Sequence, residues 1–137
     1  MSDNHTVVLH RKYDQIAAIT WSKLGKDFWS LPGTKVVAES GDGKSIGSIR
    51  FLPDVNLRET LLAYVDEEPQ FLVSYKFTEP ALGLDQYTAT WVIASEELET
   101  SSCTMTITMK SATPVFRKTL INLLQNVFLP HADPPKA

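Results

Sequence analysis

The sequence has few cysteines, no long basic run and no long apolar run, and each of these absences argues against a class of protein. Its 137 residues contain one cysteine, Cys103, which excludes an intrachain disulfide, fits a reducing compartment and is expected to pack within a strand. Lys and Arg never form a run longer than Arg11-Lys12 or Arg117-Lys118, and the net charge is −3, which argues against a nucleic-acid partner. No apolar run reaches the length of a transmembrane helix, so we expect no stable membrane insertion.

Signals for metal, phosphate and secretion are missing as well. His5, His10 and His131 lie far apart without the spacing of metal ligands, and nothing in the sequence indicates a cofactor. The segment 41–45, Gly-Asp-Gly-Lys-Ser, lacks the spacing of a phosphate-binding loop and is typical of a hairpin turn. Residues 1–5 are polar, with no apolar stretch, so we expect a cytoplasmic protein.

The sequence does contain enough apolar material for one packed domain. It is 43% hydrophobic and 21% charged, which is ordinary for a globular protein. The length favours a single domain over residues 1–137, with a structured core over about 6–129. Pro130 ends the last periodic segment, and we expect residues 130–137 to form a flexible tail.

Alternating apolar and polar side chains predict antiparallel strands with one covered face. The alternation is clearest in three segments, Phe71–Thr78, Tyr87–Ile93 and Cys103–Lys110. Four weaker strands are expected over Thr6–Arg11, Lys35–Ser40, Ser45–Leu52 and Leu57–Val65. Turn residues separate these segments, so the sequence predicts seven strands in a mostly antiparallel sheet.

A long helix is predicted at the C-terminal end of the chain. Thr113 is a suitable N-cap and Pro114 suits the first helical position. An apolar stripe at helical spacing follows, made of Val115, Phe116, Leu120, Leu123, Leu124, Val127 and Phe128. The residues that we expect to face the sheet are Phe116, Leu120, Leu124 and Val127. This helix is the only predicted element long enough to cover the apolar face of the sheet.

Shorter helical segments are expected after the first strand. Asp14 is a suitable cap for a helix over Gln15–Leu24, and Lys26–Leu31 is typical of a further short turn. The aromatic residues of this region are Trp21, Phe28 and Trp29, and we expect them to pack the short helices against the sheet or to form a rim over a cavity.

The order of elements and several short motifs together carry a resemblance. The motifs are Trp21-Ser22-Lys23-Leu24, Phe28-Trp29-Ser30-Leu31-Pro32, Gly47-Ser48-Ile49-Arg50, Arg58-Glu59-Thr60-Leu61 followed by Asp66, and Leu84-Asp85-Gln86-Tyr87. They resemble motifs of the START-like superfamily, also called SRPBCC, and of its polyketide cyclase/dehydrase-type members. The last strand departs from the family pattern, because it has Thr106-Ile107-Thr108 where a Trp or acidic residue is usual.

The resemblance implies an α+β helix-grip fold. In that fold a seven-stranded antiparallel sheet curls around a long C-terminal helix, with one or two short helices after the first strand. It also implies a cavity for a small hydrophobic molecule, polyketide-like, aromatic or lipid-like, between sheet and helix. The resemblance does not imply one reaction, because this fold hosts carriers, receptors and enzymes.

Glu59 is the most informative polar residue. It lies on a strand face that it should share with Leu57, Leu61, Ala63 and Val65, where a carboxylate is costly to bury without a partner. If the loop 53–56 is a four-residue hairpin connection, Arg50 lies opposite Glu59. The pair then either lines the cavity as a polar anchor for a ligand, or is a structural ion pair in which each side chain only satisfies the charge of the other.

One feature opposes an inward-facing pair. Ile49 and Phe51 flank Arg50 and make the opposite face of that strand the more apolar one. A bulge near Gly47, or an outward-facing pair, would resolve the conflict.

The predicted ligand site combines the pair with the inner faces of the clear strands and the helix. Its members are Arg50, Glu59, Val73, Tyr75, Phe77, Tyr87, Ala89, Trp91, Leu120 and Leu124. The aromatic residues among them would otherwise be ordinary core. If the protein is an enzyme, we expect cyclisation, dehydration or isomerisation, with Glu59 as acid or base and Tyr87 or Arg50 stabilising an oxyanion.

The competing function is a non-enzymatic carrier, ligand sensor or protein-interaction adaptor. An adaptor should expose an apolar patch, and Ala81-Leu82-Gly83-Leu84 is the candidate segment. The sequence is compatible with a monomer or a homodimer.

Overall fold

A computed structural model describes residues 4–24 and 35–135. Its strands are β1 (Asn4–Tyr13), β2 (Val37–Ser40), β3 (Ile49–Leu52), β4 (Leu57–Val65), β5 (Gln70–Phe77), β6 (Gln86–Ser95) and β7 (Ser101–Lys110). The helical elements are α1 (Ala17–Leu24), the 3-10 turn η1 (Pro53–Val55), α2 (Pro114–Leu123), the π-helical η2 (Leu124–Phe128) and the 3-10 helix η3 (Leu129–Ala132). Within this described part, no helix is long and apolar enough to cross a membrane.

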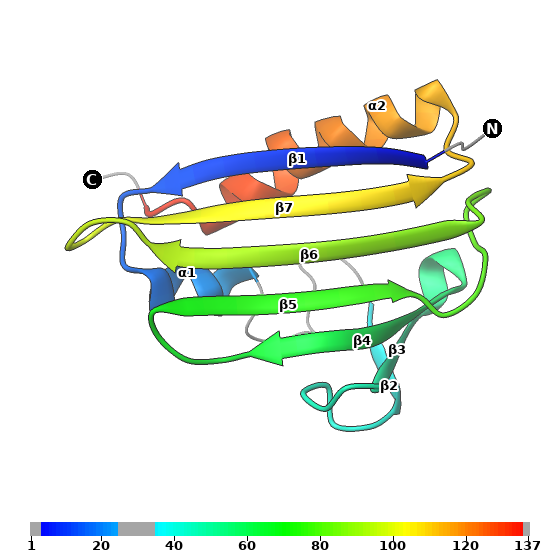
Figure 1. Cartoon of the computed structure of the whole chain (residues 1–137), viewed down its shortest axis with the longest axis horizontal. Helices are drawn as coiled ribbons and strands as arrows, with labels where there is room; N and C mark the ends of the chain where they lie inside the picture. The colour runs from blue at the N-terminus through cyan, green and yellow to red at the C-terminus, as the bar shows by residue number, and fades with distance from the viewer. Residues whose placement is uncertain (1–3, 25–34, 136–137) are drawn as a thin grey trace.

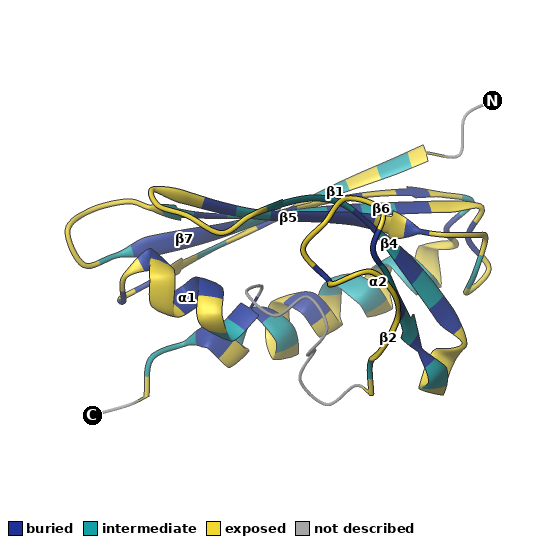
Figure 2. Ribbon diagram, turned by 90° about the horizontal axis from the view of Figure 1, so that it is seen from below, coloured by how far each residue is buried: buried dark blue, intermediate teal, exposed yellow. Residues whose placement is uncertain are grey.

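The strands form one antiparallel sheet in the order β1-β7-β6-β5-β4-β3-β2. Figure 1 shows the sheet from one side, with the C-terminal helix running across its back. Figure 2 shows α1 and α2 together on one face, with β4 and β2 turning down toward them. The predicted α+β architecture, with a seven-stranded antiparallel sheet and a C-terminal helix, is confirmed.

The inner face of the sheet, the one that faces the helices, carries the predicted alternation. The buried residues on it include Phe71, Val73, Tyr75, Phe77, Tyr87, Ala89, Trp91, Ile93, Cys103, Met105, Ile107 and Met109. Threonines and serines alternate with them, and Ser74 and Thr90 hydrogen-bond across β5 and β6 at 2.8 Å. Cys103 packs within β7 as expected, and burial raises the pKa of its thiol to about 12.

A register shift in β4 changes which residues face inward. The pairing with β5 shifts between Leu61 and Ala63, and Tyr64 then pairs with Val73. One extra residue reverses the alternation of a strand. Tyr64 therefore packs on the inner face, 5.5 Å from the Trp21 ring, whereas Val65 is 39% exposed. The expectation that Ala63 and Val65 share the face of Glu59 was wrong for this reason.

The first helix is packed against the sheet through Trp21. Its indole is 1% exposed, stacks on Phe71 at 5.3 Å and donates a 2.7 Å hydrogen bond to Asp66 Oδ1. This confirms the predicted packing of Trp21. The predictions for Phe28, Trp29 and the turn over Lys26–Leu31 fall outside the described residues.

The C-terminal helix begins as predicted, because Thr113 Oγ1 accepts a 3.1 Å hydrogen bond from the Phe116 amide. Further along, the π-helical η2 takes more residues per turn than an α-helix and shifts the side that faces the sheet by one residue. Phe128 therefore packs on Trp91 with 4.8 Å between ring centroids, and Val127 is 62% exposed. The prediction that Val127 faces the sheet was wrong.

The residues that follow α2 and η2 are anchored. Leu129 is 2% and Ala132 0% exposed, and Asp133 pairs with Arg11. We expected a flexible tail from residue 130, and the structure contradicts this for residues 130–133. Proline stops a regular helix because it lacks an amide donor, but it does not prevent packing. Here Pro130 lies inside η3, and Asp133 just after it pairs with Arg11 of β1.

Candidate functional site

The connection between β3 and β4 sets the position of the two charged residues. The turn η1 ends at Asn56 in the left-handed conformation (φ 51°), which places Leu52 opposite Leu57 and Arg50 opposite Glu59. The predicted register is therefore confirmed. Arg50 Nε donates a 2.5 Å hydrogen bond to Glu59 Oε1, and Arg50 Nη2 contacts the same oxygen. The side chains are only 1% and 5% exposed, so the pair faces inward.

The outer face of this hairpin is covered in a way that the sequence did not reveal. The Arg58 guanidinium lies over the Phe51 ring at 4.5 Å and is held by Glu39 at 2.8 Å. Long basic side chains cover apolar surface with their stems while their charged ends stay in water. Phe51 is thus half-buried on the outside, which removes the conflict with an inward-facing Arg50.

Aromatic side chains surround the ion pair on the inner face. The Arg50 guanidinium lies 4.9 Å from the centre of the Tyr75 ring, a cation–π contact. Tyr75 meets Trp91 edge-on at 5.7 Å, and Trp91 reaches Phe128 of η2. The Trp91 indole N–H is close enough to oppose the rise in the Tyr75 pKa, but it falls short of hydrogen-bond geometry.

Burial is the main influence on the pKa values of Glu59, Tyr75 and Tyr87. It raises the pKa of the Glu59 carboxyl, and the charge and hydrogen bond of Arg50 oppose that rise. Burial also raises the pKa values of Tyr75 and Tyr87, and the negative charge of Glu59 raises both further. Both phenols are therefore neutral at physiological pH and able to donate hydrogen bonds.

An open pocket of about 400 Å³ lies where β5 ends and β6 begins. Its lining consists of Lys76, Phe77, Thr78, Glu79, Pro80, Asp85, Gln86, Tyr87 and Thr88. Phe77 and Tyr87 stack at 4.4 Å, and Phe77 is the β5 partner of Glu59. Both stacked rings therefore line the pocket, and Phe77 also neighbours Glu59 in the sheet.

The remaining predicted site residues are less closely associated with the charged pair. Val73 and Ala89 are fully buried in the inner face, Leu124 is 8% exposed and Leu120 is half-buried. Sequence reasoning missed Tyr64, because nothing in β4 signals the register shift. It placed Phe128 in the apolar stripe without assigning it to the sheet.

No group of three or more His, Cys, Asp or Glu side chains in the described part is arranged to hold a metal ion. The polar chemistry near the pair is therefore that of an arginine, a carboxylate and two phenols. These groups are able to hydrogen-bond a carbonyl or a hydroxyl within an otherwise apolar wall.

Neither a protein-family model nor a curated protein matches the sequence. Solved structures do match. Ara h 8.0201 is 11% identical with a TM-score of 0.72, and the match covers 94% of this chain and 95% of that one. The chain has the helix-grip fold. A Thermobifida fusca protein solved by NMR is 16% identical, with a TM-score of 0.70 and coverage of 93% and 89%.

A third helix-grip structure is a point mutant of the norcoclaurine synthase of Thalictrum flavum in complex with a transition-state analogue. It is 16% identical, with a TM-score of 0.62 and coverage of 90% of this chain and 85% of that chain. The START-like resemblance of the sequence is thus confirmed for the fold. At such identities the likeness carries over no residue role and no reaction.

Proposed function

We propose that this protein binds a small, largely apolar molecule between the inner face of its sheet and the C-terminal helix. The Arg50–Glu59 pair, Tyr75 and Tyr87 serve as the polar anchors of that molecule. The observation that carries the proposal is a buried ion pair in an aromatic wall, in which Phe77 and Tyr87 also line an open pocket. The norcoclaurine synthase of the same fold, solved with a transition-state analogue, supports it by analogy.

The geometry favours binding over catalysis. Arg50 Nε and Nη2 both contact Glu59 Oε1, and the charge and hydrogen bond of Arg50 oppose the rise in the Glu59 pKa that burial causes. Neutral phenols suit hydrogen bonding to a ligand oxygen better than proton abstraction. Cyclisation, dehydration or isomerisation of the bound molecule would have Glu59 as its only general acid or base. We therefore propose that the protein is a carrier or a ligand sensor.

Native mass spectrometry of the purified protein tests the proposal, followed by denaturing extraction of any bound molecule. The test variant is Arg50→Met with Glu59→Leu, which removes both charges and leaves neither partner unpaired. The matched control is Arg58→Gln with Glu39→Gln, which removes an ion pair between β4 and β2 on the outer face of the sheet. Urea unfolding of each variant establishes that it is folded.

We expect a co-purified apolar molecule on the wild type and the control, and a clear loss of it from the inner double variant. Equal occupancy of the inner variant would show that the pair does not touch the ligand. If the purified wild type carries no bound molecule, the result contradicts the proposed ligand binding and favours the function of a protein-interaction adaptor.

An adaptor is the second candidate, and exposed apolar residues on the C-terminal helix favour it. Val115 is 75% exposed, Leu123 52% and Val127 62%. The predicted patch around residues 81–84 is smaller than expected, because Leu84 turns inward and is 2% exposed while Leu82 stays outside. Pull-down with the wild type and with Val115→Glu distinguishes this function, since an adaptor would lose its partner in the variant.

A further inference from the structure

The inner face of the sheet is balanced in charge. On β3 to β7 of the described chain, Arg50 and Glu59 are the only charged side chains that point inward. They contact one another directly and are almost fully buried. On β1 the inward-facing Arg11 is paired with Asp133. The charged side chains described here on β1 and on β3 to β7 that point inward are therefore each paired with one of the opposite sign.

We propose that the site selects neutral ligands bearing a carbonyl or hydroxyl oxygen and discriminates against anionic ones. This inference rests on the proposed function, since it assigns a chemical class to the molecule that the site binds. The physical reason is that a charged ligand would bring an uncompensated charge into a low-dielectric space. Arg50 would have to leave Glu59 to pair with an anion, and Glu59 would then be buried without a partner.

The tyrosines define the polar end of the ligand. Tyr75 lies against the Arg50 guanidinium, and Tyr87 lines the pocket and is close enough to Glu59 and Arg50 for their charges to shift its pKa. Burial raises the pKa of both phenols, so they keep their protons and act as hydrogen-bond donors. A neutral ketone, ester, phenol or alcohol oxygen accepts such a bond and adds no charge.

An anionic ligand would require a different state of the site. Glu59 would have to take up a proton, which its raised pKa makes easier, and Arg50 would then be left to pair with the ligand. The two Arg50 nitrogens on one carboxylate oxygen oppose that protonation, because they stabilise the ionised carboxylate. If Glu59 is ionised and paired with Arg50, the site should prefer neutral ligands. If Glu59 is protonated, the site should prefer anionic ligands, so measuring this preference distinguishes the two states.

The test uses two fluorescent probes with one aromatic skeleton. N-phenyl-1-naphthylamine is neutral, and 8-anilinonaphthalene-1-sulfonate carries an added sulfonate. Titration of the wild type gives a Kd for each probe, and the ratio of the two measures charge preference. We expect the neutral probe to bind about tenfold tighter or more.

Because any apolar pocket favours the neutral probe, variants must show that the ion pair contributes. Glu59→Gln leaves the Arg50 charge uncompensated, and we expect it to shift the Kd ratio toward the sulfonate by about tenfold or more relative to the wild type. The double variant Arg50→Met with Glu59→Leu removes both charges of the pair. Its ratio of the two Kd values should therefore stay close to that of the wild type. Both Kd values of a variant are measured on the same preparation. A partial loss of stability lowers the folded fraction equally for both probes, so the ratio of the two Kd values does not change.

Three results would overturn the inference. One is a wild type that binds the sulfonate as tightly as the neutral probe, and another is a Kd ratio that Glu59→Gln leaves unchanged. Both would leave the proposed binding function standing, because the protein would still bind an apolar probe. The third is a wild type that binds neither probe, which contradicts the proposed function and the inference together.

Discussion

Two arginines point to the inner face of this sheet, and they are held in different ways. Arg50 and its partner Glu59 are separated by nine residues in one hairpin, and their side chains are 1% and 5% exposed. Arg11 and Asp133 are separated by 122 residues and are 36% and 38% exposed. The first pair is local in the sequence and dehydrated, whereas the second is distant in the sequence and stays in contact with water.

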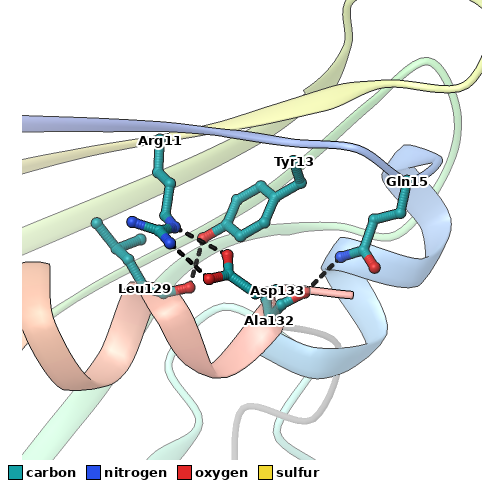
Figure 3. Close-up of polar contacts among 6 residues, drawn as sticks. All are labelled: Arg11, Tyr13, Gln15, Leu129, Ala132 and Asp133. Atoms are coloured by element: carbon teal, nitrogen blue, oxygen red, sulfur yellow. Dashed lines mark hydrogen bonds and ion pairs between the residues drawn. The ribbon is translucent and has the colours of Figure 1, made fainter. Parts of the chain in front are cut away.

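The surroundings of the two pairs differ as well. Figure 3 shows Arg11 within a group of contacts that hold the end of the C-terminal helix. The Tyr13 hydroxyl donates to the Leu129 carbonyl at 2.7 Å, and Gln15 Nε2 donates to the Ala132 carbonyl at 2.6 Å. Neutral hydrogen bonds therefore share the anchoring with Arg11. Around Arg50 the contacts are aromatic, so its charge depends on Glu59.

The two ion pairs thus contribute differently to one fold. The exposed pair fastens the chain end to β1, where solvent screening keeps its energy small. The buried pair adds little net stability, because desolvation offsets the attraction between its charges. Its presence in an apolar wall agrees with the anchoring role that we propose for it.

The largest expected effect comes from removing one partner of the buried pair. Glu59→Leu leaves the Arg50 charge buried and uncompensated, and should lower the free energy of unfolding by about 3–5 kcal/mol. Arg50→Met with Glu59→Leu should return it to within about 1 kcal/mol of the wild type. Urea unfolding of the single and double variants measures both. A double variant as unstable as the single one would mean that the pair is a structural element of the core.

A smaller effect concerns pH. The pKa of Glu59 is raised above its ordinary value of 4.5, so folding favours its protonated form. The resulting stability is fully present below pH 4.5 and is lost as pH rises through the raised pKa. The stability of the wild type relative to Glu59→Gln should therefore fall as pH rises, with a slope of at most about 1.4 kcal/mol per pH unit.

Urea unfolding of wild type and Glu59→Gln between pH 4 and 8 measures this difference. A difference that grows with pH would show that Arg50 lowers the Glu59 pKa overall, against the direction expected here.

The smallest expected effect lies at the exposed pair. Asp133→Asn should lower the free energy of unfolding by about 0.5 kcal/mol, because both side chains are more than a third exposed and screened by water. The loss should shrink further in high salt. Urea unfolding at low and high NaCl measures it. A loss comparable with that of Glu59→Leu would remove the distinction between the two arginines.

Features that depend on neighbouring residues were accessible from the sequence. Alternation predicted the inner faces of β5, β6 and β7, and Thr113 with Pro114 predicted the start of α2. The Arg50–Glu59 register followed from the length of one hairpin loop. In each case the governing interaction lies within a few residues of the chain, so a local pattern contains the information.

Other features left no local signal. The register shift in β4 brings Tyr64 against Trp21, and the π-helical η2 brings Phe128 against Trp91. Both irregularities place a large aromatic ring on a partner from another element. The anchored chain end depends on Arg11, Tyr13 and Gln15, which lie more than a hundred residues earlier.

The sequence by itself determined that a seven-stranded sheet with one apolar face would be covered by a C-terminal helix, and that Glu59 would meet Arg50. Backbone periodicity and turn length are local properties, so they suffice for those conclusions. Only the tertiary structure decided that the pair is buried against Tyr75, that Val127 faces outward and that Asp133 fastens the helix end. Burial and long-range pairing depend on how distant segments pack, and packing is a property of the whole fold.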